Sequence, residues 1–187
     1  MMGLRSGRRI AAFAGLLAVL VVPAEAQKLR ASLLDDPPIG RIPPDIVLPY
    51  WANGTPGPAD QPFRLKAELG KVVVLAFGGS GQRPGWADVA VRADSMGSPR
   101  VALVAVAWAR ANALAGLGGT SRLKILADSV GATHRRYGVR ATDGWAFFVV
   151  ADDGRLIWKA RRPEVTSPAW WAQLVAAARR GAPRLPK

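Results

Sequence analysis

The sequence predicts an α/β domain in which helices flank a central mixed β-sheet and a β-hairpin lies near the N-terminus. Residues 72–77 and 101–108 are continuous apolar runs, which predict strands buried on both faces because a half-exposed strand would alternate. The amphipathic run 84–96 between them predicts a helix, so the two strands should form a parallel pair with a right-handed crossover. Residues 145–152 and 155–159 predict an antiparallel pair, which makes the sheet mixed.

Residues 1–26 have the pattern of a secretory signal peptide. Three arginines lie within residues 1–9, an apolar run covers residues 10–22, and Ala24-Glu25-Ala26 is a small-residue cleavage site. The apolar run is well short of the roughly 20 residues that span a bilayer. We therefore expect cleavage near Ala26, a periplasmic or secreted protein, and no transmembrane segment in the mature chain. A retained anchor is the alternative.

The mature chain divides into three parts. Residues 27–43 are polar and contain two proline pairs, so we expect an extended N-terminal arm. Residues 44–181 contain the predicted strands and helices and form the domain. Residues 182–187 are a short C-terminal tail.

The N-terminal hairpin is predicted from two short segments. Residues 45–49 and the alternating residues 63–66 are typical of its two strands. Residues 53–62 between them are rich in proline and glycine, and we expect a loop that holds no β-ladder.

The rest of the sheet follows in order along the chain. Residues 109–121 predict a partly helical connection, residues 122–128 a short strand, and residues 130–137 a short helix that ends at Gly138. Asp153-Gly154 indicates a type I′ turn between the last two strands.

The final helix has clear start and stop signals. Ser167 is the expected N-cap, Pro168 stands at the first helical position, and Arg179-Arg180-Gly181 ends the helix. Its apolar face should lie across the sheet. Because Trp170 and Trp171 are adjacent, only one of them can face the sheet, and we expect the other at an edge or interface.

Composition excludes several kinds of chemistry. The 187 residues include no cysteine, which excludes disulfides, cysteine-bound metals and thiol catalysis by this chain alone. His134 is the only histidine, so a catalytic triad or a multi-histidine metal site would have to use it. We expect instead a solvent-facing side chain on a short helix, and no metal site.

The net charge of +13 falls to +11 without the signal peptide, which removes three arginines and one glutamate. Such a diffuse positive field favours anionic ligands or surfaces without specifying one. The sequence has no basic stripe interleaved with aromatic residues, so we do not expect nucleic-acid binding. The expected partners are an envelope protein or an anionic ligand, and the sequence does not specify an oligomeric state.

The order of the predicted elements resembles the thioredoxin-like fold, and in particular its peroxiredoxin and periplasmic redoxin branch. The resemblance covers roughly residues 40–180. It rests on Asp45-Ile-Val-Leu48, residues 63–77, Leu126-Ala-Asp128, Tyr137-Gly-Val139 and residues 148–157. It implies a domain built around a redox turn that follows the central strand.

The functional positions of that family have lost their redox residues. The peroxiredoxin motif Thr-Pro-x-Cys falls on residues 83–86, where only Pro84 matches and Trp86 stands at the cysteine. The alternative Cys-x-x-Cys motif of periplasmic thioredoxins falls on residues 82–85, again without sulfur. The position of the peroxiredoxin arginine, or of the thioredoxin cis-proline, falls on Trp145.

Without a thiolate, neither peroxide reduction nor sulfenic acid formation can occur. The resemblance therefore implies an exported redoxin-like protein with no catalytic residue and no cofactor, which we interpret as a binding or scaffolding module of the cell envelope. The alternative is an antioxidant oxidoreductase role in which a partner supplies the thiol. The degenerate turn is the candidate ligand or anion site, formed by Gly79, Ser80, Gly81, Gln82, Arg83, Pro84, Trp86 and Trp145.

The same turn does not match other glycine-rich motifs. Gln82 breaks the Gly-x-Ser-x-Gly nucleophile elbow, Arg83 stands where a phosphate loop needs lysine, and Pro84 replaces the third Rossmann glycine. Glycines that simply let the chain turn are the plainer interpretation. For Trp86 and Trp145, two interpretations stay open: the rings fill the old pocket, or they line a groove for an apolar ligand or a partner protein.

Overall fold

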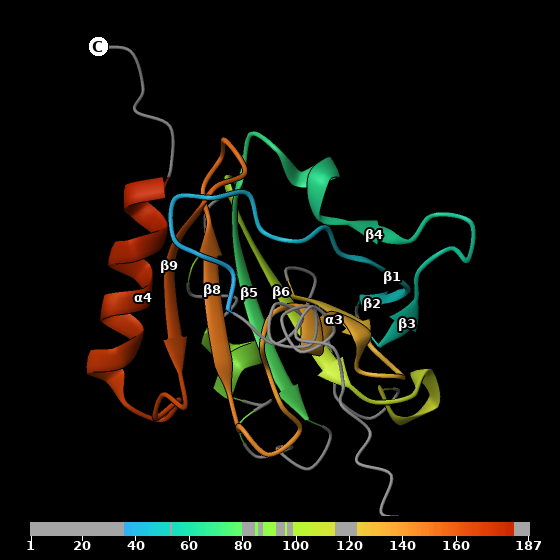
Figure 1. Ribbon diagram of the computed structural model, residues 1–187. Helices are drawn as coiled ribbons and strands as arrows, with labels where there is room; N and C mark the ends of the chain where they lie inside the picture. The colour runs from blue at the N-terminus through green and yellow to red at the C-terminus, as the bar shows by residue number, and fades with distance from the viewer. Residues whose placement is uncertain are drawn as a thin grey trace, which may run out of the picture.

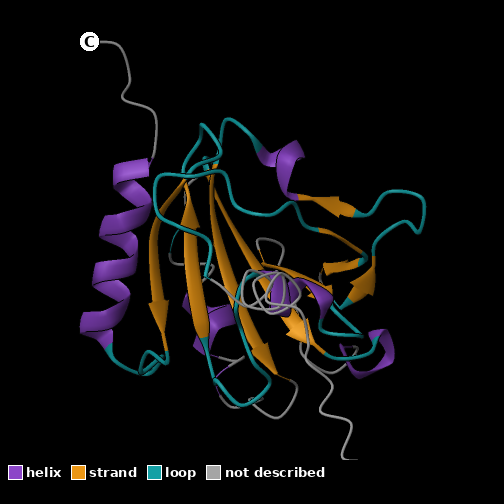
Figure 2. Cartoon of the chain, viewed as in Figure 1, coloured by secondary structure: helices purple, strands orange, loops and turns teal. Residues whose placement is uncertain are grey.

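The computed structural model describes residues 36–52, 54–79, 85, 88–92, 96, 99–114 and 123–181. The predicted signal peptide, the first part of the arm and the C-terminal tail lie outside these residues. The elements, in chain order, are β1 (Val47–Leu48), β2 (Tyr50–Ala52), β3 (Thr55–Pro56), β4 (Phe63–Arg64), the 3-10 helix η1 (Leu65–Glu68), β5 (Val72–Gly79), β6 (Val101–Trp108), the 3-10 helix η3 (Ala111–Leu114), β7 (Leu123–Ala127), α3 (Ala132–Arg136), β8 (Ala146–Val150), β9 (Leu156–Arg161) and α4 (Pro168–Gly181). Residues 85 and 88–92 are also helical (Figure 2).

Within the described residues, the main sheet has seven strands in the order β3-β2-β7-β6-β5-β8-β9 (Figure 1). β5 and β6 pair in parallel from Val72 and Val101 to Gly79 and Trp108. β7 continues the parallel part, whereas β8 is antiparallel to β5 and β9 is antiparallel to β8. These pairings confirm the predicted parallel pair, the later hairpin and the mixed sheet.

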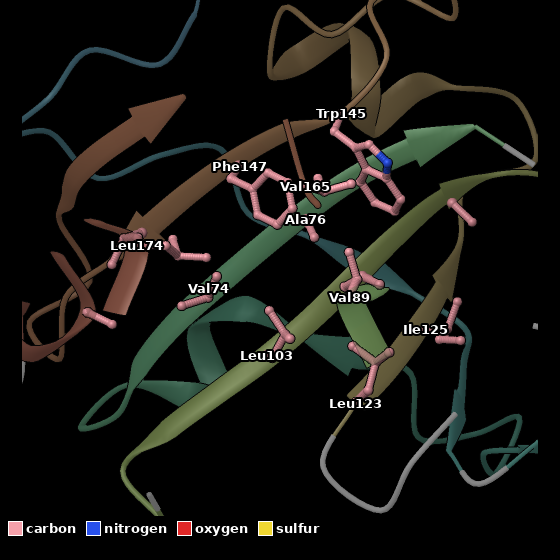
Figure 3. Close-up of a cluster of buried hydrophobic side chains, with 14 of the residues drawn as sticks. Val74, Ala76, Val89, Leu103, Leu123, Ile125, Trp145, Phe147, Val165 and Leu174 are labelled. Atoms are coloured by element: carbon pink, nitrogen blue, oxygen red, sulfur yellow. The ribbon is translucent and has the colours of Figure 1, made fainter. Parts of the chain in front are cut away.

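The side chains of β5 alternate between two hydrophobic cores, one on each face of the sheet. Val74 and Ala76 belong to the core that includes Val89 and the buried side of α4 (Figure 3). Phe77 belongs to the other core, together with Tyr137, which directly follows α3. Burial on both faces explains why the run has no polar residue.

The N-terminal hairpin is confirmed, although it is short. β1 pairs antiparallel with β4, and η1 begins at Leu65, where the sequence predicts a longer strand. The prediction that residues 53–62 hold no β-ladder was wrong, because Thr55 and Pro56 form β3 and pair with β2. Pro56 is tolerated there because β3 is the outermost strand, so a missing N–H leaves no neighbouring strand unpaired.

The turn between β8 and β9 differs from the predicted type I′ turn. Gly154 has a φ of 84°, but Arg162 is the only non-glycine residue with positive φ in the described chain, so Asp153 is not left-handed. The Gly154 N–H donates to the Ala151 carbonyl at 2.9 Å, and the Ala151 N–H donates to the Arg155 carbonyl at 2.8 Å. This pattern is a longer loop with a glycine bulge, which needs one left-handed residue instead of two.

Helix α4 begins as predicted. The Trp170 N–H donates to the Ser167 hydroxyl oxygen at 3.4 Å, which confirms the cap. Trp171 is buried, whereas Trp170 is half-buried, and its ring centroid lies 6.4 Å from that of Trp158 on the edge strand β9. Both rings nevertheless pack on Phe147 of β8, with centroid distances of 4.6 Å for Trp170 and 5.9 Å for Trp171. The prediction that only one tryptophan can face the sheet was therefore wrong, although Trp170 also reaches the edge strand. In the part of the chain that the structure describes, no helix combines the length and apolar character needed to cross a bilayer.

Candidate functional site

The C-terminal ends of the parallel strands meet at one edge of the sheet. Gly79 at the end of β5 pairs with Trp108 at the end of β6, and Asp128 directly follows β7. Trp145 directly precedes β8, whose first residue pairs with Phe77 of β5. Ligand sites of open α/β sheets lie at this kind of edge, so these positions define the candidate site.

The Trp145 ring fills space beside residue 85. The side chain is 7% exposed and belongs to the buried cluster shown in Figure 3. A Cβ atom placed on Gly85 would lie 2.5 Å from Trp145 Nε1, which is too close for any contact. Residue 85 is the second cysteine position of the Cys-x-x-Cys alignment, so the indole occupies the place that a side chain there would need.

Six of the predicted site residues lie outside the described residues: Ser80, Gly81, Gln82, Arg83, Pro84 and Trp86. The structure places the other two at the same edge of the sheet: Gly79 ends β5, and Trp145 directly precedes the neighbouring strand β8. A ligand or anion site in this turn therefore stays a prediction, and so does a contact between the two tryptophans.

His134 is buried, so the prediction of a solvent-facing histidine was wrong. Its residue exposure is 1%, and its ring centroid lies 5.0 Å from that of Phe77 and 5.2 Å from that of Trp108. Nδ1 lies 2.8 Å from Asp128 Oδ2, and the same oxygen accepts the His134 backbone N–H at 2.8 Å. These bonds satisfy Nδ1 and the backbone N–H of His134, which burial would otherwise leave without partners.

The Asp128 carboxylate fixes the orientation of this ring. Burial raises the pKa of Asp128, but hydrogen bonds from the side chain and backbone of His134 and from the Ala132 backbone outweigh it. The pKa therefore lies below its usual value. Nε2 of His134 is buried and has no hydrogen-bond partner among the described residues. The pair thus presents one oriented imidazole nitrogen without a partner.

This pair alone does not make a catalytic centre. A hydrolase triad needs a nucleophile hydrogen-bonded to the free imidazole nitrogen, and the described residues supply none. They also contain no group of three His, Cys, Asp or Glu residues placed to hold a metal ion. Sequence reasoning missed the pair, although an aspartate directly after a buried strand and six residues before the single histidine was an available signal.

A polar cavity of about 360 Å³, which we call the arginine hollow, borders the segment that precedes β8. It is lined by Asp36, Gly138, Arg140, Asp143, Arg161 and Arg162. Three guanidinium groups therefore face two carboxylates. The surplus of positive charge suits an anionic group.

Two of the three arginines in the hollow are already paired. Arg161 forms an ion pair with Asp36, and Arg162 Nη2 donates to Asp143 Oδ1 at 3.1 Å. Arg140 forms no ion pair within the described part of the chain. The Arg162 backbone N–H donates to the Trp145 carbonyl at 2.8 Å, which ties the hollow to the candidate edge.

Comparison with solved structures shows which fold the chain has. The chain is similar to a structure described as the thiol:disulfide interchange protein DsbE from Chlorobium tepidum, with 21% identity, a TM-score of 0.60, and coverage of 76% of this chain and 99% of that one. It is also similar to a structure described as a protein disulfide isomerase from Bacteroides thetaiotaomicron, with 16% identity, a TM-score of 0.57, and coverage of 78% and 90%. A reduced 2-Cys peroxiredoxin from Plasmodium vivax gives 17% identity, a TM-score of 0.56, and coverage of 76% and 82%.

These similarities establish a thioredoxin-like fold, as the sequence predicts. At such low identities the likeness concerns the fold alone. No protein-family model and no curated protein matches the sequence. The chain is thus a thioredoxin-like domain whose sequence contains no cysteine.

Proposed function

We propose that this protein is a non-catalytic binding module with a redoxin-like fold, exported to the cell envelope. The observation that carries the proposal is the Trp145 ring beside Gly85, in a chain without cysteine. Reduction of a disulfide or a peroxide needs a thiolate nucleophile, and an indole cannot replace it. The function of this domain is therefore not thiol chemistry carried out by this chain alone.

The binding surface in this proposal is the sheet edge around Trp145, completed by the degenerate turn of residues 79–84 and Trp86. The adjacent arginine hollow supports an anionic group as the recognised feature, because three arginines line it together with only two aspartates. Arg162 couples the hollow to the edge through its hydrogen bond to the Trp145 carbonyl. The export part of the proposal is supported by the signal-peptide pattern of residues 1–26.

The binding proposal is tested by titrating inorganic phosphate into the purified chain from residue 27 onward while recording NMR spectra. We expect shifts at the Trp145 indole N–H and at Arg140 and Arg162, which weaken as salt rises. The double variant Arg140→Gln/Arg162→Gln should lose them. The variant Arg179→Gln/Arg180→Gln, matched in charge at the far end of α4, should keep them. Equal losses in both variants would mean a general charge effect and would reject the site.

The absence of catalysis is tested with insulin-reduction and peroxide-consumption assays, each with and without envelope extract. We expect no turnover by the chain alone. Activity that appears only with extract would favour the alternative, in which a partner supplies the thiol. Activity of the purified chain without additions would refute the proposal. Cell fractionation and the mass of the mature N-terminus test export, for which we expect a periplasmic chain that begins near Gln27.

A further inference from the structure

An apolar cavity of about 150 Å³ lies at the opposite end of the sheet from Trp145. Its floor is Val73 of β5 and Val150 of β8, which pair across the two strands. Leu65 of η1 forms a wall, and the exposed side chains of Ile42 and Leu69 lie at its mouth. Figure 1 shows the N-terminal segment (blue) passing across β8 and β5 near this end of the sheet.

Backbone hydrogen bonds prevent the cavity from closing. The Gly70 N–H donates to the Asp152 carbonyl at 2.9 Å and holds the end of η1 to the turn after β8. The Leu156 N–H donates to the Arg41 carbonyl at 2.8 Å, and the Gly40 N–H donates to the Leu156 carbonyl at 2.7 Å. The N-terminal segment is therefore fixed to β9. A cavity collapses only where its surroundings can move, and two valines are too short to fill this one.

The charged residues around the cavity already have partners. Glu68 accepts hydrogen bonds from Lys71 Nζ at 2.9 Å and from Lys124 Nζ at 2.8 Å. Lys66 Nζ lies 3.9 Å from Asp45 Oδ2, and Asp153 Oδ2 lies 3.5 Å from Arg155 Nε. A charged ligand would lose its hydration without finding a free counter-ion, so the cavity favours a neutral occupant.

We propose that this cavity binds an uncharged apolar molecule about the size of one aromatic ring. The size follows from the volume, because an apolar cavity of about 150 Å³ in another protein holds one benzene molecule. The chemical class follows from the aliphatic floor and the paired charges at the rim. Leu69, which is 59% exposed, gives the ligand an apolar entrance. The site is independent of the edge around Trp145.

The proposal is tested by NMR titration of methyl-labelled protein with benzene, benzoate and benzylammonium. We expect saturable benzene shifts at the methyl groups of Leu65, Val73 and Val150. The two charged analogues should bind at least about tenfold more weakly, because each must be desolvated. A titration without saturable shifts at these methyl groups would overturn the proposal, and so would benzoate or benzylammonium binding as tightly as benzene.

A filled cavity provides the second test. Val73→Phe places a ring in the cavity and should abolish the benzene shifts. Val130→Phe, at a residue that is 67% exposed near the other end of the sheet, should keep them. If Val73→Phe does not fold, Leu69→Gln changes only the mouth and should weaken benzene binding several-fold. An unchanged affinity for benzene in the folded Val73→Phe variant would overturn the proposal. If only Leu69→Gln folds, an unchanged affinity for benzene in that variant would do the same.

Discussion

Replacing Asp128 by alanine removes the oxygen that accepts two hydrogen bonds from His134, each at 2.8 Å. Both donors would then be left without an acceptor, and the two side chains are each only 2% exposed. An unsatisfied buried donor costs about 1–3 kcal/mol, and breaking a buried pair by removing one partner costs about 3–5 kcal/mol. We therefore expect Asp128→Ala to lower the free energy of unfolding by about 3–5 kcal/mol.

Urea unfolding with linear extrapolation measures this loss. The matched control is Asp153→Ala. Asp153 Oδ2 lies 3.5 Å from Arg155 Nε, and both side chains are more than half exposed. An exposed pair of this kind contributes about 0–1 kcal/mol. Equal losses for the two alanine variants would refute the buried pair, because Asp128 would then behave like a surface carboxylate.

Two further measurements separate the pair from a general packing effect. The double variant Asp128→Leu/His134→Phe removes both polar partners and should be less destabilised than Asp128→Ala alone. Because the pKa of Asp128 is lowered by folding, its ionised form stabilises the protein above the usual value of 3.8, and this contribution is lost as the pH falls through the folded pKa. The difference in the free energy of unfolding between wild type and Asp128→Ala should therefore become smaller only in acid. Narrowing near neutral pH would contradict this assignment.

Gly85→Ala should destabilise the protein because its Cβ would meet the Trp145 ring, and the loss should shrink in a Trp145→Ala background. If the losses of stability from Gly85→Ala and Trp145→Ala simply add in the double variant, as measured by thermal unfolding, the two residues do not touch. Glu68→Gln should cost about 1 kcal/mol, because both lysine partners are more than a third exposed. Burial raises the pKa of Glu68, but its two lysine partners lower it by more, so the folded pKa lies below the usual value of 4.5. The difference in the free energy of unfolding between wild type and Glu68→Gln should therefore fade below pH 4.5. A difference that persists in strong acid would contradict this assignment. Ser167→Ala should cost about 0.5–1 kcal/mol through the lost cap, and unchanged hydrogen exchange at the start of α4 would count against it.

The long strands could be predicted because burial on both faces determines their composition. Residues 72–77 and 101–108 contain only apolar side chains, and their short length and many valines favour a buried strand over a buried helix. The strand at Thr55–Pro56 could not be predicted, because it exists only where β2 is held by β7. The Asp153-Gly154 pair suits two kinds of turn, and the register between β8 and β9 decides which one forms.

The candidate site was only partly predictable for a similar reason. The structure places Trp145 directly before β8, but its match to the arginine or cis-proline position of the family stays a prediction. The burial of His134 depends on Asp128, which becomes its partner only when β7 and α3 fold together. The arginine hollow combines Arg140 with Arg161 of β9, and no local pattern connects those positions.

Strand β5 pairs with β6, which follows it closely in the sequence, and with β8, which comes much later. Val73 pairs with Ala102 on one side and with Val150 on the other. Contacts between segments so far apart in the sequence slow folding. During synthesis, an entirely apolar strand therefore has an open edge until β8 is made, and such an edge is a template for pairing with other chains. A chain truncated before residue 146 would contain both of its longest strands and still be an aggregation hazard.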